Sequence, residues 1–209
     1  MSVQILIDHR SGLGPVKDQG RRPTCLSHAA TLAHESVRQH PEALSVEYLH
    51  WFAETSQGGG AKLDAVASSL RDRGQPSDAV CPYFPGGPPS GWLPPTVATL
   101  RRASEERDAS ADEVHSLLKR ALTPLLVVRL PESFYYPAAP WVIPSLGPVR
   151  GTHAVVAVGT GEYFGSRVVL TRNSWGEGWG DGGHAWLDDT FLRRYLLRVL
   201  VLTYEVSSA

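Results

Sequence analysis

The hydrophobic pattern changes character half-way along the chain, and this change restricts the possible fold more than any other feature. Apolar residues first recur at helical spacing, whereas the second half carries short runs rich in β-branched residues. The expected helices cover residues 26–37, 45–53, 63–70 and 111–122. The expected strands cover residues 125–128, 154–158, 168–170 and 200–204. This order predicts an α+β protein with two lobes and a site in the cleft between them.

Two of the expected connections are long. Residues 104–110 are charged and polar, which predicts a solvated linker between the helical and strand-rich halves. Residues 131–151 hold five prolines and four aromatic residues, and such a long loop in a compact domain usually has a function.

Composition excludes several classes of protein. Hydrophobic residues make up 42% of the 209 residues, enough to bury a core. Twenty basic and twenty-one acidic residues give a formal charge of −1, which argues against nucleic-acid and electrostatic membrane binding. No stretch approaches the ~20 apolar residues of a membrane span, and residues 1–14 lack the pattern of a secretory signal. We therefore expect a cytoplasmic protein, or one exported without a cleavable signal.

Cys25 stands at the start of the first expected helix. The partial positive charge of a helix N-terminus favours the thiolate, which is the nucleophilic form of cysteine. Taken alone, Cys25 fits a buried structural thiol better than a nucleophile, since free cysteine is among the most buried residue types. Gln19 lies six residues upstream, and a carboxamide near a nucleophile can donate a hydrogen bond to an oxyanion. Most loop glutamines, however, meet only water.

Two later residues provide the other roles of a nucleophilic site. His153 precedes a strand-like run and could take a proton from Cys25 as a general base. Asn173 opens an Asn-Ser-Trp-Gly turn, and its side chain can orient an imidazole by accepting a ring N–H, with Trp175 covering that bond. The alternatives are a core histidine and a tight turn packed on aromatic residues.

Taken together, these residues occur in an order that resembles papain-like cysteine peptidases, and the resemblance covers most of the chain. The similar segments are Ile7–Arg10, Pro15–Gly20 followed by Cys25, Ser45–Glu54 followed by Gly58–Gly60, Cys81–Tyr83, Thr152–Val155 with Gly159, and Asn173–Gly176 with Trp179, Gly180 and Gly183. The Asn173 segment is the most specific of these.

The resemblance implies a papain-like two-lobed α+β fold. Residues 1–108 would form the mainly helical lobe that carries the nucleophile, with residues 1–10 packing on the other lobe. Residues 109–209 would form an antiparallel, β-barrel-like lobe that carries the histidine and the asparagine. The active-site cleft would lie between the two lobes.

The resemblance also implies the role of each site residue. Cys25 would be the nucleophile, His153 the base and later the acid, and Asn173 the group that orients His153. Gln19 would form the oxyanion hole together with the Cys25 backbone N–H. The expected substrate-binding residues are Gly58, Gly59, Gly60, Thr152 and Trp175.

The function expected from these roles is that of a cysteine endopeptidase, selective for few proteins and acting inside a cell or as a toxin-like effector. Two alternatives use the same site: an acyl transferase or peptide ligase, and a catalytically inactive binding module. The expected partners are a protein or peptide substrate and an inhibitor or immunity protein, and the chain is expected to be a monomer. No cofactor or metal is expected, because the cysteines and histidines lack the usual ligand spacing.

The chain departs from the family pattern near the nucleophile. Many relatives carry a disulfide-forming cysteine where this chain has Arg22, and the missing disulfide suits a reducing compartment or a bacterial relative. The family's glycine and tryptophan around the nucleophile are Pro23 and Leu26 here. The region similar to the family begins near residue 7, so either an inhibitory propeptide has been removed or the activity is controlled in another way. His28 is a rival base because it lies one helical turn after Cys25, and Cys81 is expected to be a buried thiol.

Overall fold

The computed structural model describes residues 2–37, 42–53 and 59–206. Its helices are α1 (Cys25–Ser36), α2 (Val46–Ala53), α3 (Leu63–Asp72), α4 (Ala111–Lys119) and α5 (Asp189–Tyr195). Its strands are β1 (Gln4–Asp8), β2 (Arg101–Arg107), β3 (Leu125–Pro131), β4 (Val142–Ile143), β5 (Val149–Tyr163), β6 (Ser166–Arg172), β7 (His184–Asp188) and β8 (Leu196–Val206). The 3-10 turns are η1 (Arg10–Gly12) and η2 (Glu132–Tyr135).

The described strands form one sheet with β5 at its centre. The strand order is β2-β8-β3-β5-β6-β7-β4, and β1 pairs with β5 outside this path. Each of these pairs is antiparallel except β4 with β7. β5 is 15 residues long, and it pairs with β3 through its first half and with β6 through its second. The expected α+β class with an antiparallel second lobe is therefore confirmed.

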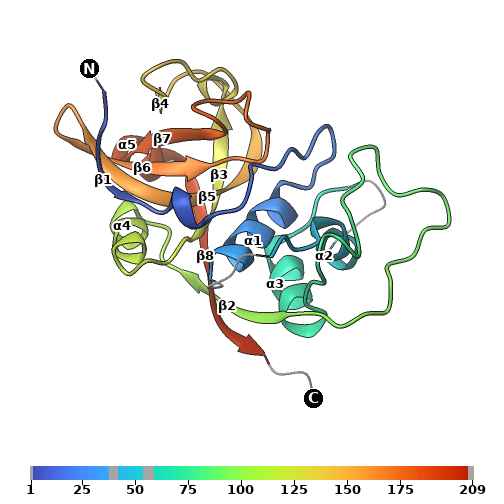
Figure 1. Cartoon of the computed structure of the whole chain (residues 1–209). Coiled ribbons are helices and arrows are strands. Elements are labelled where there is room, and N and C mark those ends of the chain that lie inside the picture. The colour runs from blue at the N-terminus through green and yellow to red at the C-terminus, as the bar shows by residue number, and fades with distance from the viewer. Residues whose placement is uncertain (1, 38–41, 54–58, 207–209) are drawn as a thin grey trace.

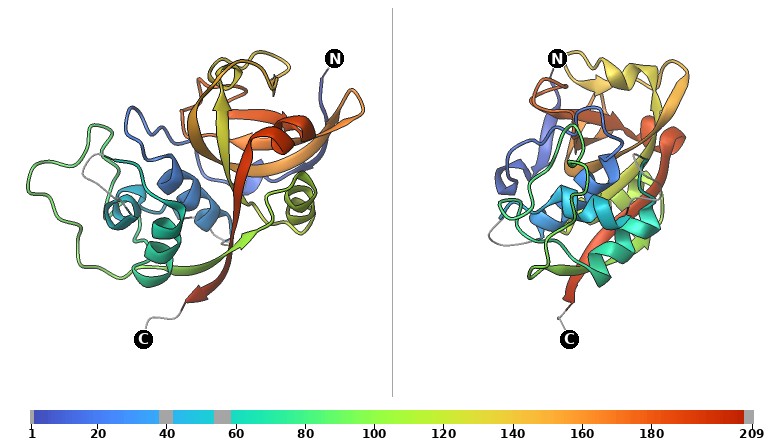
Figure 2. Two further views of the ribbon diagram at one scale, coloured as in Figure 1. Left: turned by 180° about the vertical axis from the view of Figure 1, so that it is seen from behind. Right: turned by 90° about the vertical axis from the view of Figure 1, so that its right-hand side faces the viewer.

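Two apolar clusters support this arrangement. One fills the curled sheet beneath α4 and α5 and includes Phe134 and Phe191. The other joins α1, α2 and α3 to the sheet, and it includes Ala30 of α1 and Val156 of β5. Because its alanines are small, α1 packs closely on the sheet, and Figures 1 and 2 show it between the sheet and the other two helices of the first lobe. This contact brings the start of α1 beside β5.

The expected linker at residues 104–110 is wrong over its first part, because residues 104–107 belong to β2. This strand pairs antiparallel with β8, from Arg101 opposite Val206 to Arg107 opposite Val199. Only Ala103 of β2 is buried, so the charged side chains of this edge strand face solvent while its backbone is paired. Figure 2 shows β8 running from the sheet past the helices, with β2 beside it.

Gly159 allows β1 to lie against β5. A Cβ atom at this position would stand 2.4 Å from the carbonyl oxygen of Ile7, a distance that real Cβ atoms do not show. The N-terminal segment therefore requires a residue without a side chain at this point of β5, and this explains why a glycine follows the His153 strand run.

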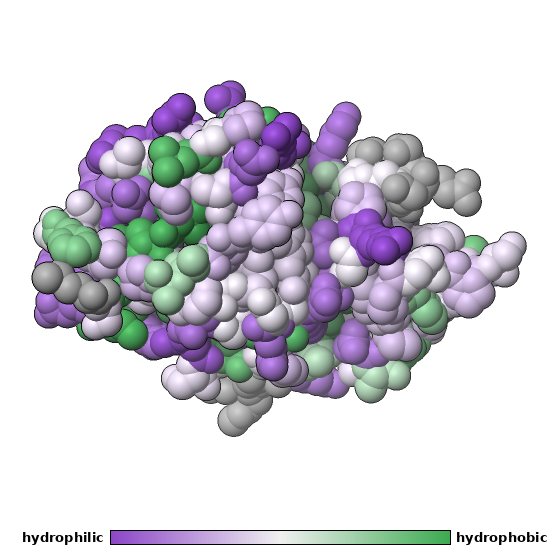
Figure 3. Space-filling model, turned by 90° about the horizontal axis from the view of Figure 1, so that it is seen from above, coloured by the Kyte–Doolittle hydropathy of each residue, from purple (hydrophilic) through white to green (hydrophobic). Residues whose placement is uncertain are grey.

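Figure 3 looks down on the face where the helices meet the sheet, and hydrophobic residues gather mainly on the side of the sheet. The exposed apolar residues between η2 and β5 include Tyr136 and Leu146, and Val149 at the start of β5 is also exposed. Among the described residues, none of the helices combines the length and the apolar character that crossing a lipid bilayer would require.

Candidate active site

Cys25 is the first residue of α1, as expected from the sequence. Its thiol is hydrogen-bonded to the backbone of Ala154 on β5 and to the backbone at the start of its own helix. Burial nevertheless raises the pKa of the Cys25 thiol above its ordinary value, because the loss of water outweighs these backbone N–H groups. The backbone at the helix N-terminus lowers the pKa of the thiol, as expected, but burial has the larger and opposite effect.

His153 and Asn173 are brought together by two neighbouring strands. His153 lies on β5, and Asn173 directly follows β6. His153 Nε2 donates a hydrogen bond to Asn173 Oδ1 at 2.6 Å, and both residues are buried. Burial lowers the pKa of His153 to about 4, so the imidazole is neutral at pH 7. With Nε2 held by Asn173, the Nδ1 atom is the ring nitrogen that remains for proton transfer.

The thiol and the imidazole come from the two lobes. The Cys25 thiol is hydrogen-bonded to the residue that follows His153 on β5, which places the helix start and the imidazole-bearing strand in direct contact. Among the described residues, no hydrogen bond joins the thiol to the imidazole itself. The approach of Cys25 to His153 Nδ1 therefore stays a prediction.

Aromatic side chains cover the histidine–asparagine pair. The ring of Trp175 lies 4.7 Å from that of His153, centroid to centroid. Phe134 contacts both rings, and Tyr135 stacks on Trp175 at 5.4 Å with an angle of 24° between the ring planes. Sequence reasoning identified Trp175 but missed Phe134 and Tyr135. The unusual aromatic content of the 131–151 loop is the sequence feature from which they could have been predicted.

Gln19 is anchored from two sides. Its side-chain Nε2 donates to the carbonyl of Arg22 at 2.8 Å, and its Oε1 accepts from Ser174 Oγ at 2.7 Å. Its backbone N–H also donates to the carbonyl of Ser174 at 2.8 Å. Because an amide nitrogen carries two hydrogens, one N–H of Gln19 remains for a ligand. Ser174, next to Asn173, thereby links the two lobes at the site.

The other expected substrate-binding residues are Gly58, Gly59, Gly60 and Thr152. Gly58 lies outside the described residues. Gly59 is half-buried and Gly60 exposed, and a Cβ atom on Gly60 would lie 3.5 Å from the carbonyl of Pro23, two residues before the nucleophile. Thr152 is exposed on β5, directly before His153. Gly60 and Thr152 therefore flank Cys25 and His153 respectively.

The rival residues have structural partners. His28 Nδ1 donates to the carbonyl of Thr24 at 3.1 Å, and the ring packs edge-on against Tyr83. Burial lowers the pKa of His28 to about 3, so it is neutral and locked in place. Cys81 is 1% exposed and free, and its carbonyl accepts a hydrogen bond from Ser45 Oγ. Neither residue has a described contact with Cys25.

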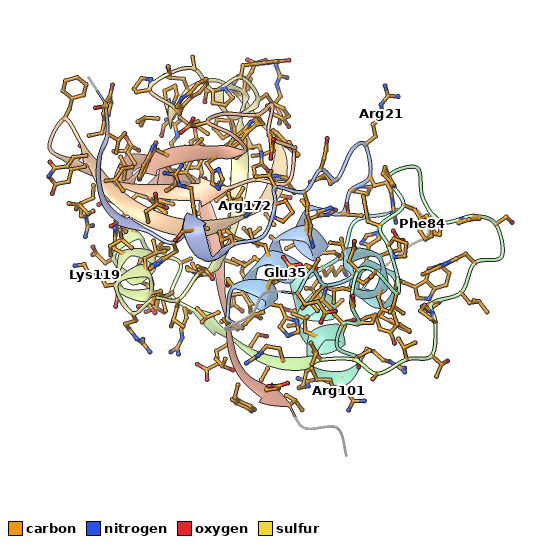
Figure 4. All side chains as sticks on the ribbon, viewed as in Figure 1. Arg21, Glu35, Phe84, Arg101, Lys119 and Arg172 are labelled. Carbon is orange, nitrogen blue, oxygen red and sulfur yellow. The ribbon has the colours of Figure 1, made fainter. Side chains whose placement is uncertain are left out.

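A small cavity of about 20 Å³ lies between α1 and the sheet, close to the site. Its lining includes Lys17, Glu35 and Arg172, and Figure 4 shows Glu35 on α1 near Arg172 at the end of β6. Glu35 Oε1 accepts from Lys17 Nζ at 2.7 Å and from the backbone N–H of Leu44 at 2.8 Å. Burial lowers the pKa of Arg172, and the Glu35 carboxylate opposes this effect. A buried carboxylate of the first lobe and a buried guanidinium of the second therefore line one cavity beneath the site.

Glu35→Ala is expected to lower the free energy of unfolding by about 3 kcal/mol, because it leaves the half-buried Lys17 and the buried Arg172 without a nearby carboxylate. Urea unfolding at pH 7 measures this loss. The matched control is Asp72→Ala, whose ion pair with Arg71 is exposed and is expected to contribute nothing measurable. An equal, small effect of both variants would show that the Glu35 cluster does not hold the lobes together.

Comparison with known proteins agrees with this geometry. The model of the papain family of cysteine proteases matches residues 135–191, which include His153, Asn173 and Trp175. The resemblance to papain-like cysteine peptidases is confirmed. Cathepsin K of Gallus gallus is 28% identical over 185 residues, which are 83% of this chain and 54% of that protein. The chain spans about half the length of the curated relatives that it matches.

Solved structures show that the fold is papain-like. The digestive procathepsin L 3 of Tenebrio molitor larval midgut matches with a TM-score of 0.77 at 20% identity, over 95% of this chain and 69% of that one. The cysteine protease CMS1MS2 of Carica candamarcensis, solved in complex with E-64, matches with a TM-score of 0.74 at 20% identity, over 94% and 97% of the two chains. At this identity the likeness concerns the fold alone.

Proposed function

We propose that the protein is a cysteine peptidase that cleaves peptide bonds through an acyl-thioester on Cys25. The observation that carries the proposal is the 2.6 Å hydrogen bond between His153 and Asn173, on the strand whose next residue, Ala154, binds the Cys25 thiol. A nucleophile, a base and a group that orients the base are the three parts of this chemistry. The family match over residues 135–191 supports the same assignment.

In the proposed reaction, His153 Nδ1 takes the thiol proton while the sulfur attacks the scissile carbonyl carbon. The C–N bond then breaks, and the leaving amine receives that proton from the imidazolium. His153 then deprotonates a water molecule, which attacks the thioester carbonyl. The C–S bond breaks, and the sulfur takes the proton back from the imidazolium. Burial raises the pKa of the Cys25 thiol and lowers the pKa of His153, and Asn173 holds the ring in position as it takes up the proton.

Gln19 is proposed to stabilise the oxyanion with its remaining N–H, together with the backbone N–H of Cys25. Gln19→Ala is expected to lower kcat by about 10²–10³-fold, the usual loss when one oxyanion donor is removed, with a smaller change in KM. Steady-state cleavage of a fluorogenic peptide measures it. Gln4→Ala, at an exposed position on β1, is the matched control and should leave kcat unchanged. Equal kcat values for the two variants would remove Gln19 from the oxyanion hole.

The substrate is proposed to be a protein or peptide that lies in extended form past Gly59 and Gly60 and contacts Thr152 and Trp175. Extended peptides bind glycine-lined edges through strand-like backbone hydrogen bonds. Transfer of the acyl group to an amine would use the same residues as hydrolysis. Mass analysis of the products, with and without an added amine, distinguishes a peptidase from a transferase or ligase.

We further propose that the protein acts in the cytoplasm or as a toxin-like effector, and that it has few target proteins. Its monomeric state and its control by an inhibitor or immunity protein also stay predictions. A reducing compartment is supported by the free state of Cys25 and Cys81 and by the arginine at position 22. Mapping of new protein N-termini in a proteome, after treatment with the active protein or with Cys25→Ala, would identify the targets.

A further inference from the structure

Arg22 and Glu47 form a buried ion pair beside Gln19. Arg22 Nη1 lies 2.5 Å from Glu47 Oε2, and Nη2 lies 3.0 Å from Oε1, so the contact is bidentate. The side chain of Glu47 is 1% exposed and that of Arg22 16%. Glu47 belongs to α2, whereas Arg22 belongs to the loop before α1, so the pair joins two separate segments. Arg22 occupies the position at which many papain-like peptidases carry a disulfide-forming cysteine.

The pair also holds the segment around Phe84. Arg22 Nη1 donates to the carbonyl of Phe84 at 2.7 Å, and the backbone N–H of Phe84 donates to Glu47 Oε2 at 3.2 Å. The guanidinium lies 5.0 Å from the ring centroid of Tyr83. Three segments, before α1, on α2 and at residues 83–84, therefore meet at one pair of charges.

Gln19 depends on this cluster at two atoms. The backbone carbonyl of Arg22 accepts one side-chain N–H of Gln19 at 2.8 Å. The hydroxyl of Tyr83 donates to the backbone carbonyl of Gln19 at 2.8 Å. Ser174 holds the opposite edge of the amide. A planar amide that is bound at both its nitrogen and its oxygen has a fixed orientation, which also fixes the direction of the second N–H.

We propose that the Arg22–Glu47 ion pair is a positioning element for the oxyanion donor Gln19. It keeps the Arg22 carbonyl where it accepts a side-chain N–H of Gln19, and it lies against Tyr83, whose hydroxyl donates to the Gln19 backbone carbonyl. The inference rests on the proposed peptidase function. It differs from a purely structural role, in which the pair would change stability without acting through Gln19. Buried ion pairs often contribute little net stability, so a positioning role gives the pair a separate physical reason.

A double-mutant cycle on kcat tests the proposal. Glu47→Gln keeps the shape of the side chain and removes its charge, and we expect it to lower kcat about 10-fold with little change in KM, a fraction of the loss on removing the donor itself. In a Gln19→Ala background the same change is expected to alter kcat less than 2-fold, because the group that it positions is gone. An equal loss in both backgrounds would overturn the proposal.

The chain offers a matched control in the neighbouring residue. Arg21 is exposed and makes no hydrogen bond or ion pair to the described residues, and Figure 4 shows it pointing away from the molecule. Arg21→Gln is expected to leave kcat unchanged, while Arg22→Gln lowers it. Arg22→Lys, which keeps the charge but loses the bidentate geometry, is expected to fall between them. If Arg22→Gln does not fold, the neutral double variant Arg22→Gln/Glu47→Gln replaces it.

A second measurement needs no turnover, so it separates this proposal from the proposed function. The side-chain amide protons of Gln19, identified in an NMR spectrum by their loss in Gln19→Ala, report its hydrogen bonds directly. We expect Glu47→Gln to shift these resonances and Arg21→Gln to leave them in place. Unshifted resonances in Glu47→Gln would overturn the positioning role. Absence of Cys25-dependent cleavage by the unaltered protein would instead overturn the peptidase function and leave this spectroscopic test valid.

Discussion

Cys25→Ala is expected to abolish peptide cleavage while leaving the fold intact. The change removes the sulfur that forms the acyl-enzyme, and loss of the nucleophile in another triad hydrolase lowers kcat about 10⁶-fold. The side chain is half-buried at the start of α1, and alanine suits a helix, so we expect the far-ultraviolet circular dichroism spectrum to be unchanged. Cleavage of an internally quenched peptide library, with products identified by mass, measures the loss.

The second cysteine provides the control for this experiment. Cys81 is also free but fully buried, with its carbonyl bonded to Ser45 directly before α2, and it has no described contact with His153. Cys81→Ala should therefore retain cleavage, apart from any loss of stability. Alkylation by iodoacetamide should inactivate the protein in step with modification of Cys25, located by peptide mapping. Full activity of Cys25→Ala would exclude the thioester mechanism.

The protein is expected to lose several kcal/mol of stability as the pH falls from 6.5 toward 4. His28 and His153 are buried and neutral, with pKa values lowered to about 3 and about 4, while in the unfolded chain both titrate near 6.5. Above pH 6.5 neither the folded nor the unfolded state binds these protons, so the two histidines do not reduce the free energy of unfolding. Below pH 6.5 the unfolded chain binds protons at these two histidines while the folded protein does not, so the free energy of unfolding falls. A pKa lowered from 6.5 to about 3 corresponds to about 5 kcal/mol for His28 by pH 3.

Urea unfolding at a series of pH values between 7 and 4 measures this dependence. His28→Asn keeps a donor for the Thr24 carbonyl and removes one titrating group, so the slope of stability against pH should become shallower by about 1.4 kcal/mol per pH unit in this range. Burial also lowers the pKa of His115 and His184, and both add to the slope in the same direction. A wild-type slope in His28→Asn would show that His28 is not the residue that resists protonation.

The sequence was sufficient to predict most of the local structure. The helical stripes, the β-rich runs and the position of Cys25 at a helix start all depend on residues that are close together along the chain. The segment from Asn173 to Trp179 is equally local, because a turn with this many glycines and tryptophans has few possible conformations. These predictions succeed because periodicity and turn chemistry act within a few residues.

Other features depend on partners that the chain order does not reveal. The charged segment at residues 104–107 is a strand because β8, about a hundred residues away, provides its pairing partner. The raised pKa of Cys25 depends on burial in the folded chain, which outweighs the local effect of the helix N-terminus. Burial and pairing are set by the whole fold, so local composition alone does not predict the net result in either case.

The sequence alone was therefore sufficient to propose which residues carry the chemistry, since a thiol, an imidazole and two carboxamides in this order have few other combined uses. Only the tertiary structure decided how they are supported. Arg22 and Glu47 are 25 positions apart, and the aromatic cover of His153 comes from η2 and from the turn after β6. The physical reason is that a hydrogen bond or an ion pair acts over about 3 Å of space, whatever its separation along the chain.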